Sequence, residues 1–213
     1  MSLQSQVLGA LGTVYDPELD EPITTLGFVG SCVVSGRDVS VRLRLPTPQC
    51  APNFAFLMAA DARRAVQALP GIGAVTIELE DHYTGREINR AVNHDEGFEG
   101  AFPGETAGDL DALRALFQRK ALLAHQCRLM NEPATTLGEL TGPEADRCRA
   151  LRTALGIDAS DGAPAFVTGD GTPVDAADVR FRRMASLTAL SLEANGGICR
   201  DLLKVRYREE VAA

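Results

Sequence analysis

The stretch VSVRLRLPTPQCAPNFAFLMAADARRAVQALPGIGAVTIELE, residues 39–80, decides the fold. Its first residues alternate apolar and polar side chains, which predicts a strand with one buried face. Residues 52–69 then carry apolar side chains at helical spacing, and the Pro-Gly pair at 70–71 ends that helix. Residues 75–80 alternate again. Two strands joined through a helix predict a short sheet with a helix packed on one face.

The residues before this stretch extend the pattern at its N-terminal side. Residues 2–13 have helical spacing, and residues 28–34 are apolar and rich in β-branched side chains. The SGRD turn at 35–38 joins that strand to the next one as a hairpin. The order is therefore α-β-β-α-β, and the fold class is α+β: a small α/β sandwich followed by a mainly helical C-terminal region.

The domain division follows from a change of composition. Residues 93–108 are rich in glycine and acidic side chains, so we interpret them as a linker between a domain at 1–92 and a helical extension at 109–213. Within the extension, PAFVTGDGTPVD at 164–175 predicts a small hairpin. The NGG triplet at 195–197 predicts a break in a long C-terminal helix.

Composition narrows the class of protein. The chain is 45% hydrophobic and 23% charged, which predicts a packed core, and its net charge of −8 argues against binding to nucleic acid or to an anionic membrane surface. The N-terminus lacks the basic region of a signal peptide. The five cysteines include no CxxC pair, so neither a disulfide framework nor a complete zinc site is expected. A reducing cytoplasm fits this usage.

Cys50 is the first candidate for chemistry. It follows a strand and precedes a helix whose first turn contains Pro52, a residue favoured at that position. A cysteine at or just before the N-cap faces unpaired N–H groups and the positive end of the helix dipole, which stabilise a thiolate. A thiolate binds a soft metal or attacks an electrophile. The alternative is a small buried residue that closes the turn. We also expect the hydroxyl of Thr47 to order this loop.

Three further residues are candidates for a metal site. Asp16, in the acidic loop DPELDE, is a candidate ligand, although locally a solvated loop with Asp16 capping a turn is favoured. His82 follows the last strand of the first domain, where it is a co-ligand or proton acceptor if it meets Cys50, and otherwise a surface residue. Cys199, after the predicted glycine break, is the candidate for a second thiolate, with packing as the alternative.

Residues 3–92 resemble a known family. The segments VYDPELDEPITTLGFV, VRLRLPTPQCAPNF and ALPGIGAVTIELE are similar, in content and order, to those of the iron–sulfur cluster assembly domain of the PaaD and SufT type. The resemblance implies an α/β sandwich that helps to mature metal centres, with the loop cysteine, here Cys50, as its key residue and Asp16 in the acidic loop. Two features differ: Cys50 is followed by Ala51 before Pro52, and the PaaD-type C-terminal cysteine cluster is missing from the sequence.

The second half carries a fainter resemblance. LRALFQRKALLAHQCRLM at 113–130 and SLEANGGICRDLLKVRY at 191–207 are similar to the extension of assembly proteins associated with propane-type di-iron monooxygenases. This implies a di-iron hydroxylase as client, together with other iron–sulfur assembly proteins as partners. The cargo implied is iron or an iron–sulfur cluster, held transiently, and no nucleotide is expected.

These observations favour a metallocentre assembly factor that is not an enzyme. One thiolate per chain cannot fill a four-cysteine cluster, so we expect a homodimer or a client-supplied ligand to complete the site. The first alternative is a metal-free chaperone or adaptor that binds the hydroxylase through the helical half. A thiol-dependent enzyme using Cys50 and His82 ranks last, because the sequence shows no third partner for such a pair.

Overall fold

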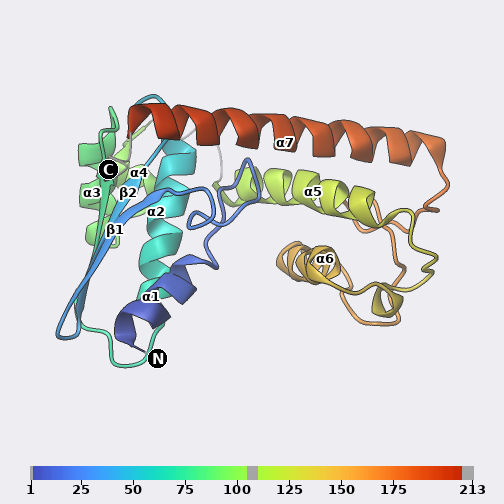
Figure 1. Ribbon diagram of the computed structural model, residues 1–213, viewed down its shortest axis with the longest axis horizontal. Helices are drawn as coiled ribbons and strands as arrows, with labels where there is room; N and C mark the ends of the chain where they lie inside the picture. The colour runs from blue at the N-terminus through green and yellow to red at the C-terminus, as the bar shows by residue number, and fades with distance from the viewer. Residues whose placement is uncertain (1, 105–109, 208–213) are drawn as a thin grey trace, which may run out of the picture. The chain divides into compact units, whose positions relative to one another are not determined.

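A computed structural model of the chain describes residues 2–104 and 110–207. The chain forms two compact units: residues 1–110 together with 196–213 make the first unit, and residues 111–195 make the second. The C-terminal segment, which the sequence assigned to the helical extension, therefore belongs with the α/β unit. Figure 1 follows the chain from end to end.

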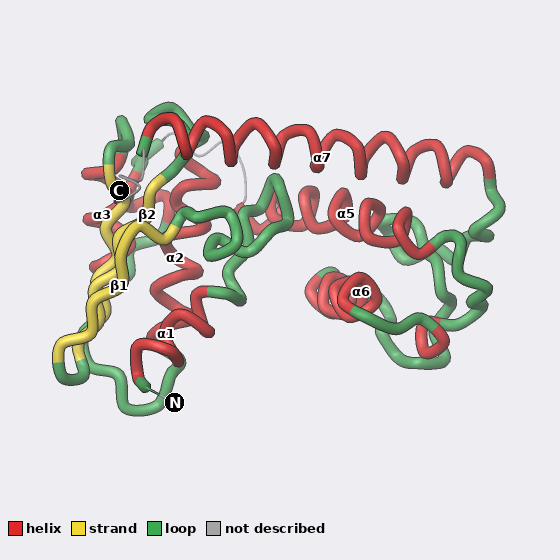
Figure 2. The backbone as a smooth tube through the Cα atoms, in the orientation of Figure 1, coloured by secondary structure: helices red, strands yellow, loops and turns green. Residues whose placement is uncertain are grey.

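The first unit has the predicted α+β architecture. Its elements are α1 (Leu3–Leu11), β1 (Val29–Ser35), β2 (Asp38–Arg44), α2 (Pro52–Gln67) and β3 (Val75–Glu80). The sheet has the order β1-β2-β3, with β1 antiparallel and β3 parallel to β2, and Figure 2 shows the three strands side by side. Because parallel neighbours need a crossover connection, α2 joins β2 to β3.

One face of this sheet is buried and the other meets solvent. Val39, Val41 and Leu43 of β2 are buried and alternate with exposed residues, as the sequence predicted. The buried side chains pack with those of α1 and α2 in the core of the first unit. On the outer face, Arg42 of β2 pairs with Glu78 of β3 at 3.2 Å. The sheet therefore has the one-sided pattern that a two-layer sandwich requires.

The helix α3 (Gly85–Asn93) closes the outer edge of β3. The side-chain amide of Asn93 accepts from the N–H of Ile77 at 2.9 Å and donates to the carbonyl of the same residue at 2.7 Å. Asn89, one turn earlier, makes the same two bonds to Leu79. Because an unpaired edge invites pairing with another chain, these two asparagines take the place of a fourth strand.

The segment interpreted as a linker contributes to the first unit. The short helix α4 (Phe98–Ala101) lies within it, and Ala101 and Phe102 are buried in the core of that unit. Glycine and acidic content alone therefore overestimated the length of the connection. Residues 105–109 of the predicted linker lie outside the described residues.

The second unit is mainly helical. It contains α5 (Leu110–Leu129), a 3-10 turn at Leu137–Glu139, α6 (Pro143–Ala154) and the first part of α7 (Val179–Arg206). Arg152 is fully buried and donates to the carbonyls of Pro164 and Ala165 at 2.9 and 2.7 Å. The expected small hairpin at 164–175 is present: Val167 and Pro173 form an antiparallel bridge, the N–H of Thr168 donates to the carbonyl of Thr172 at 2.8 Å, and the N–H of Val174 donates to that of Phe166 at 3.1 Å.

The predicted break at NGG is wrong, because α7 continues through these residues to Arg206. A Cβ atom on Gly196 would lie 2.9 Å from Oε1 of Glu21, whereas one on Gly197 would meet nothing within 4 Å. Gly196 therefore allows close packing against the acidic loop. In a sequence, a glycine needed for packing looks the same as a glycine that ends a helix. Among residues 2–104 and 110–207, no helix is both long and apolar enough to cross a bilayer.

Candidate functional site

Cys50 lies in the loop between β2 and α2. Ala51 is the N-cap residue of α2 and Pro52 begins the helix, so Cys50 lies immediately before it, where the sequence placed it. The first N–H groups of a helix have no partners within it, and they face this loop with the positive end of the dipole. Cys50 is partly buried and packs against the core of the first unit. The loop therefore holds Cys50 at the positive end of the α2 dipole.

Thr47 and Cys50 interact through both backbone and side chains. The N–H of Cys50 donates to the carbonyl of Thr47 at 3.4 Å, and the Thr47 hydroxyl lies 3.5 Å from the Cys50 sulfur. These contacts form a turn that presents the sulfur at the start of α2. Thr47 is therefore placed where the loop-ordering role expects it.

His82 meets Cys50, but through the backbone and not the sulfur. Its Nε2 lies 2.7 Å from the carbonyl oxygen of Cys50, and its Nδ1 lies 3.3 Å from the N–H and 3.1 Å from the hydroxyl of Thr84. This network assigns a neutral ring with the proton on Nε2. Burial, together with the positive charge of Arg206, lowers the pKa of His82 against the opposing effect of the Cys50 carbonyl. Both ring nitrogens are engaged, so His82 here positions the loop.

Asp16 is buried at the turn that begins the acidic loop. Its Oδ1 accepts the N–H groups of Glu18 at 2.9 Å and Leu19 at 2.8 Å. Burial raises the pKa of Asp16 to about 6, and the charges of Glu18 and Glu21 add to the effect of burial, while the two N–H donors oppose it. A capping role and a ligand role are compatible, because both of these hydrogen bonds use Oδ1 of the carboxylate.

Cys199 is brought to the same region by the end of α7. Burial raises the pKa of Cys199 to about 11, and the negative charges of Asp16, Cys50 and Glu18 contribute in the same direction. The positive charge of Arg200 opposes these effects on the pKa only in part, so Cys199 is a neutral thiol at neutral pH. The neighbouring Arg200 bonds Glu21 at 2.7 Å, so this turn of α7, which carries Cys199, contacts the acidic loop. The expectation that Cys199 opens a helix is wrong, because it lies inside α7.

The last turns of α7 are fixed against the candidate site by polar contacts. Arg200 bonds both oxygens of Glu21 at 2.7 Å. Arg206 donates to the carbonyl of Leu45 at 3.0 Å and to that of Asp81, which precedes His82. The sequence carries no local signal for these contacts, since each bond joins segments more than 100 residues apart. The contacts hold Cys199 where it meets the Cys50 loop.

The remaining cysteines lie elsewhere. Cys32 is in β1 and packs against the core of the first unit, as its place in an apolar strand predicted. Cys127 and Cys148 belong to the second unit, the first partly buried and the second buried. Cys50 and Cys199 are therefore the pair of thiols that the first unit brings to one place.

This arrangement offers a few ligands and no closed cage. Within the described residues, no three His, Cys, Asp or Glu side chains are grouped so as to hold a metal ion. Cys50 and Cys199, which both pack against the core of the first unit, are its candidate sulfur ligands near the acidic loop. Sulfur ligands suit iron–sulfur clusters and other soft metal centres. The geometry is compatible with an open site that a further molecule completes.

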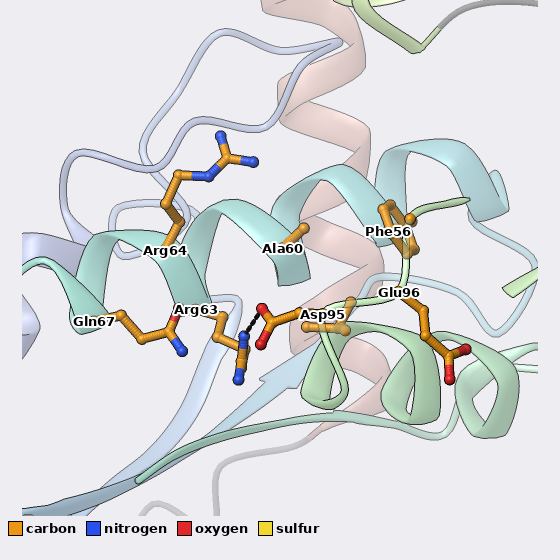
Figure 3. Close-up of a pocket in the computed structure, with 9 residues that line it drawn as sticks. Phe56, Ala60, Arg63, Arg64, Gln67, Asp95 and Glu96 are labelled. Atoms are coloured by element: carbon orange, nitrogen blue, oxygen red, sulfur yellow. Dashed lines mark hydrogen bonds and ion pairs between the residues drawn. The ribbon is translucent and has the colours of Figure 1, made fainter. Parts of the chain in front are cut away.

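A separate pocket of about 230 Å³ lies between α2 and the loop that follows α3. Figure 3 shows the guanidinium of Arg63 turned toward Asp95, with which it forms an ion pair, while Arg64 points away from that pair. The lining carries Arg63, Arg64, Asp95 and Glu96, so its formal charges balance. We interpret this pocket as part of the packing that fixes the loop after α3.

Comparison with known proteins adds the following findings. A family model described as iron–sulfur cluster assembly protein matches residues 4–79. An iron–sulfur cluster carrier protein of Deinococcus radiodurans is 34% identical over 77 residues, which are 36% of this chain and 21% of the relative. An uncharacterized protein of Methanocaldococcus jannaschii is 31% identical over 97 residues, 45% of this chain and 100% of the relative. The chain thus matches about a fifth of the carrier protein and all of the archaeal protein.

Proposed function

The chain belongs to the iron–sulfur cluster assembly protein family, and we propose that it holds iron or an iron–sulfur cluster transiently at Cys50 and delivers it to a client metalloenzyme. The observation that carries this proposal is the place of Cys50. It lies within the matched residues and immediately before α2, and the last turns of α7, which carry Cys199, contact the loop that Asp16 begins.

The neighbours of Cys50 take distinct roles in this proposal. Cys199 is the second sulfur ligand, since an arriving cation would favour its thiolate over the neutral thiol. Asp16 supplies an oxygen ligand or balances charge, and His82 positions the loop through the Cys50 carbonyl. A four-ligand centre needs more than this set, so a second copy of the chain or the client completes it. Incomplete ligation suits a cargo that must leave.

The client and the chemistry are further parts of the proposal. We infer a soluble di-iron monooxygenase as the client, on the resemblance of residues 113–130 and 191–207 to the extension of monooxygenase-associated assembly proteins. The chain acts as a carrier and not as an enzyme, because its thiolates exchange metal–sulfur bonds with an incoming or departing centre and convert no substrate into a product. Other iron–sulfur assembly proteins would supply the cargo.

Anaerobic reconstitution tests the role of Cys50. The protein is incubated with ferrous iron and sulfide, desalted, and examined for thiolate-to-iron absorption and bound iron. We expect Cys50→Ala to abolish both signals and Cys199→Ala to reduce them. Cys127→Ala is the matched control, because Cys127 is also a partly buried free thiol but belongs to the second unit. Retention of iron and absorption by Cys50→Ala would contradict the proposal.

One observation favours a second function, that of a metal-free adaptor for the hydroxylase. In the second unit, α7 exposes Leu187 and Leu190, which are 60% and 63% accessible. Large apolar side chains on a helix surface are typical of contacts with a partner. An adaptor would bind and activate its client equally well as wild type and as Cys50→Ala. A carrier would bind the client in both forms but lose activation in the variant.

A further inference from the structure

A groove of about 610 Å³ lies between the start of β1 and the last turns of α7. Both sides belong to the first unit. One side is formed by Leu26 and Val29, and the other by Leu203 and Tyr207. The volume is within the range of roughly 300–1,000 Å³ that is usual for ligand sites. It corresponds to about twenty water molecules, given a share of about 30 Å³ each. A single carboxylate or phosphate would leave most of it unfilled.

Three cations line this groove, and none of the described residues that line it is acidic. Arg44 lies on the strand side, while Arg200 and Lys204 follow each other by one turn on α7. Arg44 uses Nε to bond Glu80 at 2.8 Å, and Arg200 uses one Nη to bond Glu21. In the described part of the chain, both Nη groups of Arg44 and the second Nη group of Arg200 bond no protein atom. Guanidinium donors therefore remain for an anionic ligand.

Two glycines give the groove its shape. Gly27 has φ of +76°, and a Cβ atom there would lie 3.3 Å from the side chain of Leu203. A Cβ atom on Gly30 would lie 2.5–2.9 Å from three side-chain atoms of Arg44. Because Gly30 has no Cβ, the side chain of Arg44 can extend across β1 at this position. The ring of Tyr207 lies 5.0 Å from the same guanidinium, which fixes its position further.

We propose that this groove binds an acidic peptide segment of the client, in which carboxylates alternate with apolar side chains. The carboxylates meet cations on both sides, and the apolar side chains pack between Leu26, Val29 and Leu203. The identification of the occupant as the client rests on the proposed function; the peptide site itself does not. Arg200 follows Cys199 in sequence, so a segment bound here would bring its protein next to the two thiols.

Charge and shape favour a peptide over other anions. Nucleic acid is disfavoured because its binding depends mainly on many phosphate contacts, whereas this groove has three cations and large apolar side chains between them. A small anion would engage one cation and leave the apolar surfaces exposed to water. A peptide satisfies separated cations and apolar surface together, as is typical of peptide recognition grooves.

Fluorescence anisotropy on the full, metal-free chain tests the site. The probe is a labelled nine-residue peptide with alternating glutamate and leucine, and the comparison peptide has lysine in place of glutamate. We expect saturable binding of the acidic peptide that weakens with added salt, and no binding of the lysine peptide. Lys204→Glu should weaken binding by roughly fivefold or more, since an exposed charge pair contributes up to about 1 kcal/mol and reversal adds repulsion.

Arg64→Glu is the matched control. Lys204 and Arg64 have side chains that are 76% and 78% exposed, and each pairs weakly with an acid three residues earlier, at 3.4 and 3.5 Å. Only Lys204 lines the groove, so Arg64→Glu should bind the peptide like wild type.

Three results would overturn the proposal: absence of peptide binding, equal loss in Lys204→Glu and Arg64→Glu, or full displacement of the peptide by equimolar citrate or inorganic phosphate, which would indicate a small-anion site. Cys50→Ala should bind the peptide normally. A failure of iron binding at Cys50 would therefore leave the peptide site unaffected. A failure of peptide binding would likewise leave the role of Cys50 unaffected.

Discussion

Replacing Asp16 with asparagine is expected to stabilise the first unit at neutral pH. The Asp16 side chain is buried, at 7% exposure, and its Oδ1 accepts two backbone N–H groups at 2.9 and 2.8 Å. An asparagine retains an acceptor oxygen for both donors. It removes the charge that burial disfavours. Because Asp16 is a carboxylate kept in an unfavourable environment, the substitution separates its structural role from its electrostatic one.

The magnitude follows from the pKa of Asp16. Burial raises that pKa from 3.8 to about 6 in the folded protein. The native state therefore binds more protons than the unfolded chain between about pH 4 and pH 6, and the free energy of unfolding decreases as pH rises through this interval. Above about pH 6 the free energy of unfolding is lowered by the full cost of burying the charged Asp16 carboxylate. The difference between the two pKa values corresponds to about 3 kcal/mol, which sets the upper value for the gain in Asp16→Asn.

Urea unfolding followed by tyrosine fluorescence measures this effect in the relevant unit. The chain has no tryptophan, and its three tyrosines, Tyr15, Tyr83 and Tyr207, all belong to the first unit. At pH 7.5 the midpoint for Asp16→Asn should lie higher than that of wild type by on the order of 1 M. At pH 4 the two proteins should unfold at nearly the same concentration, because wild-type Asp16 is then protonated in the native state.

Asp38→Asn is the control for this measurement. Asp38 also accepts a backbone N–H, from Ala74 at 2.8 Å, but its side chain is exposed. The control should leave the midpoint nearly unchanged at both pH values. The reasoning is refuted if Asp16→Asn is no more stable than wild type at pH 7.5. It is also refuted if the gain has the same size at both pH values.

Four further substitutions test the packing of the first unit. Gly197→Ala should raise the free energy of unfolding by about 0.5–1 kcal/mol, as expected inside a helix. Gly196→Ala should give no gain or a loss, because its Cβ would lie 2.9 Å from the Glu21 carboxylate. Thermal unfolding of both variants measures this difference. Asn93→Ala should lower the free energy of unfolding by about 2–3 kcal/mol, because it leaves an N–H and a carbonyl of β3 unpaired. A urea midpoint within error of wild type would contradict the role of Asn93 at the edge of β3. His82→Ala should increase the rate of Cys50 alkylation several-fold, as measured by mass spectrometry. An unchanged rate would argue against the role of His82 in positioning the Cys50 loop.

The architecture of the first unit could be read from local patterns. Alternation in residues 39–45 and 75–80, and helical spacing in 52–69, reflect which side chains face the core, and burial in the structure follows them. Cys50 could be placed at the start of α2 because Pro52 marks that position. These signals come from neighbours in sequence, and the physics that produces them is equally local.

Two predictions failed because local composition has more than one physical meaning. The glycines at 196 and 197 lie inside a continuous helix, where the first of them admits the Glu21 carboxylate. The segment 93–108 begins with Asn93, which pairs with β3, and contains a helical turn at 98–101. A glycine or a run of acidic residues indicates a turn or linker only when those residues make no tertiary contact.

The sequence by itself determined the α-β-β-α-β order and the position of Cys50 at a helix start. Tertiary structure alone decided which groups surround that cysteine. Glu21 and Arg200 are 179 residues apart, and their pairing helps to hold Cys199 beside Asp16 and Cys50. The physical reason is that periodicity and turn chemistry record a residue's near neighbours. The ligands of a site depend instead on packing between distant segments, which leaves no repeating signal in the sequence.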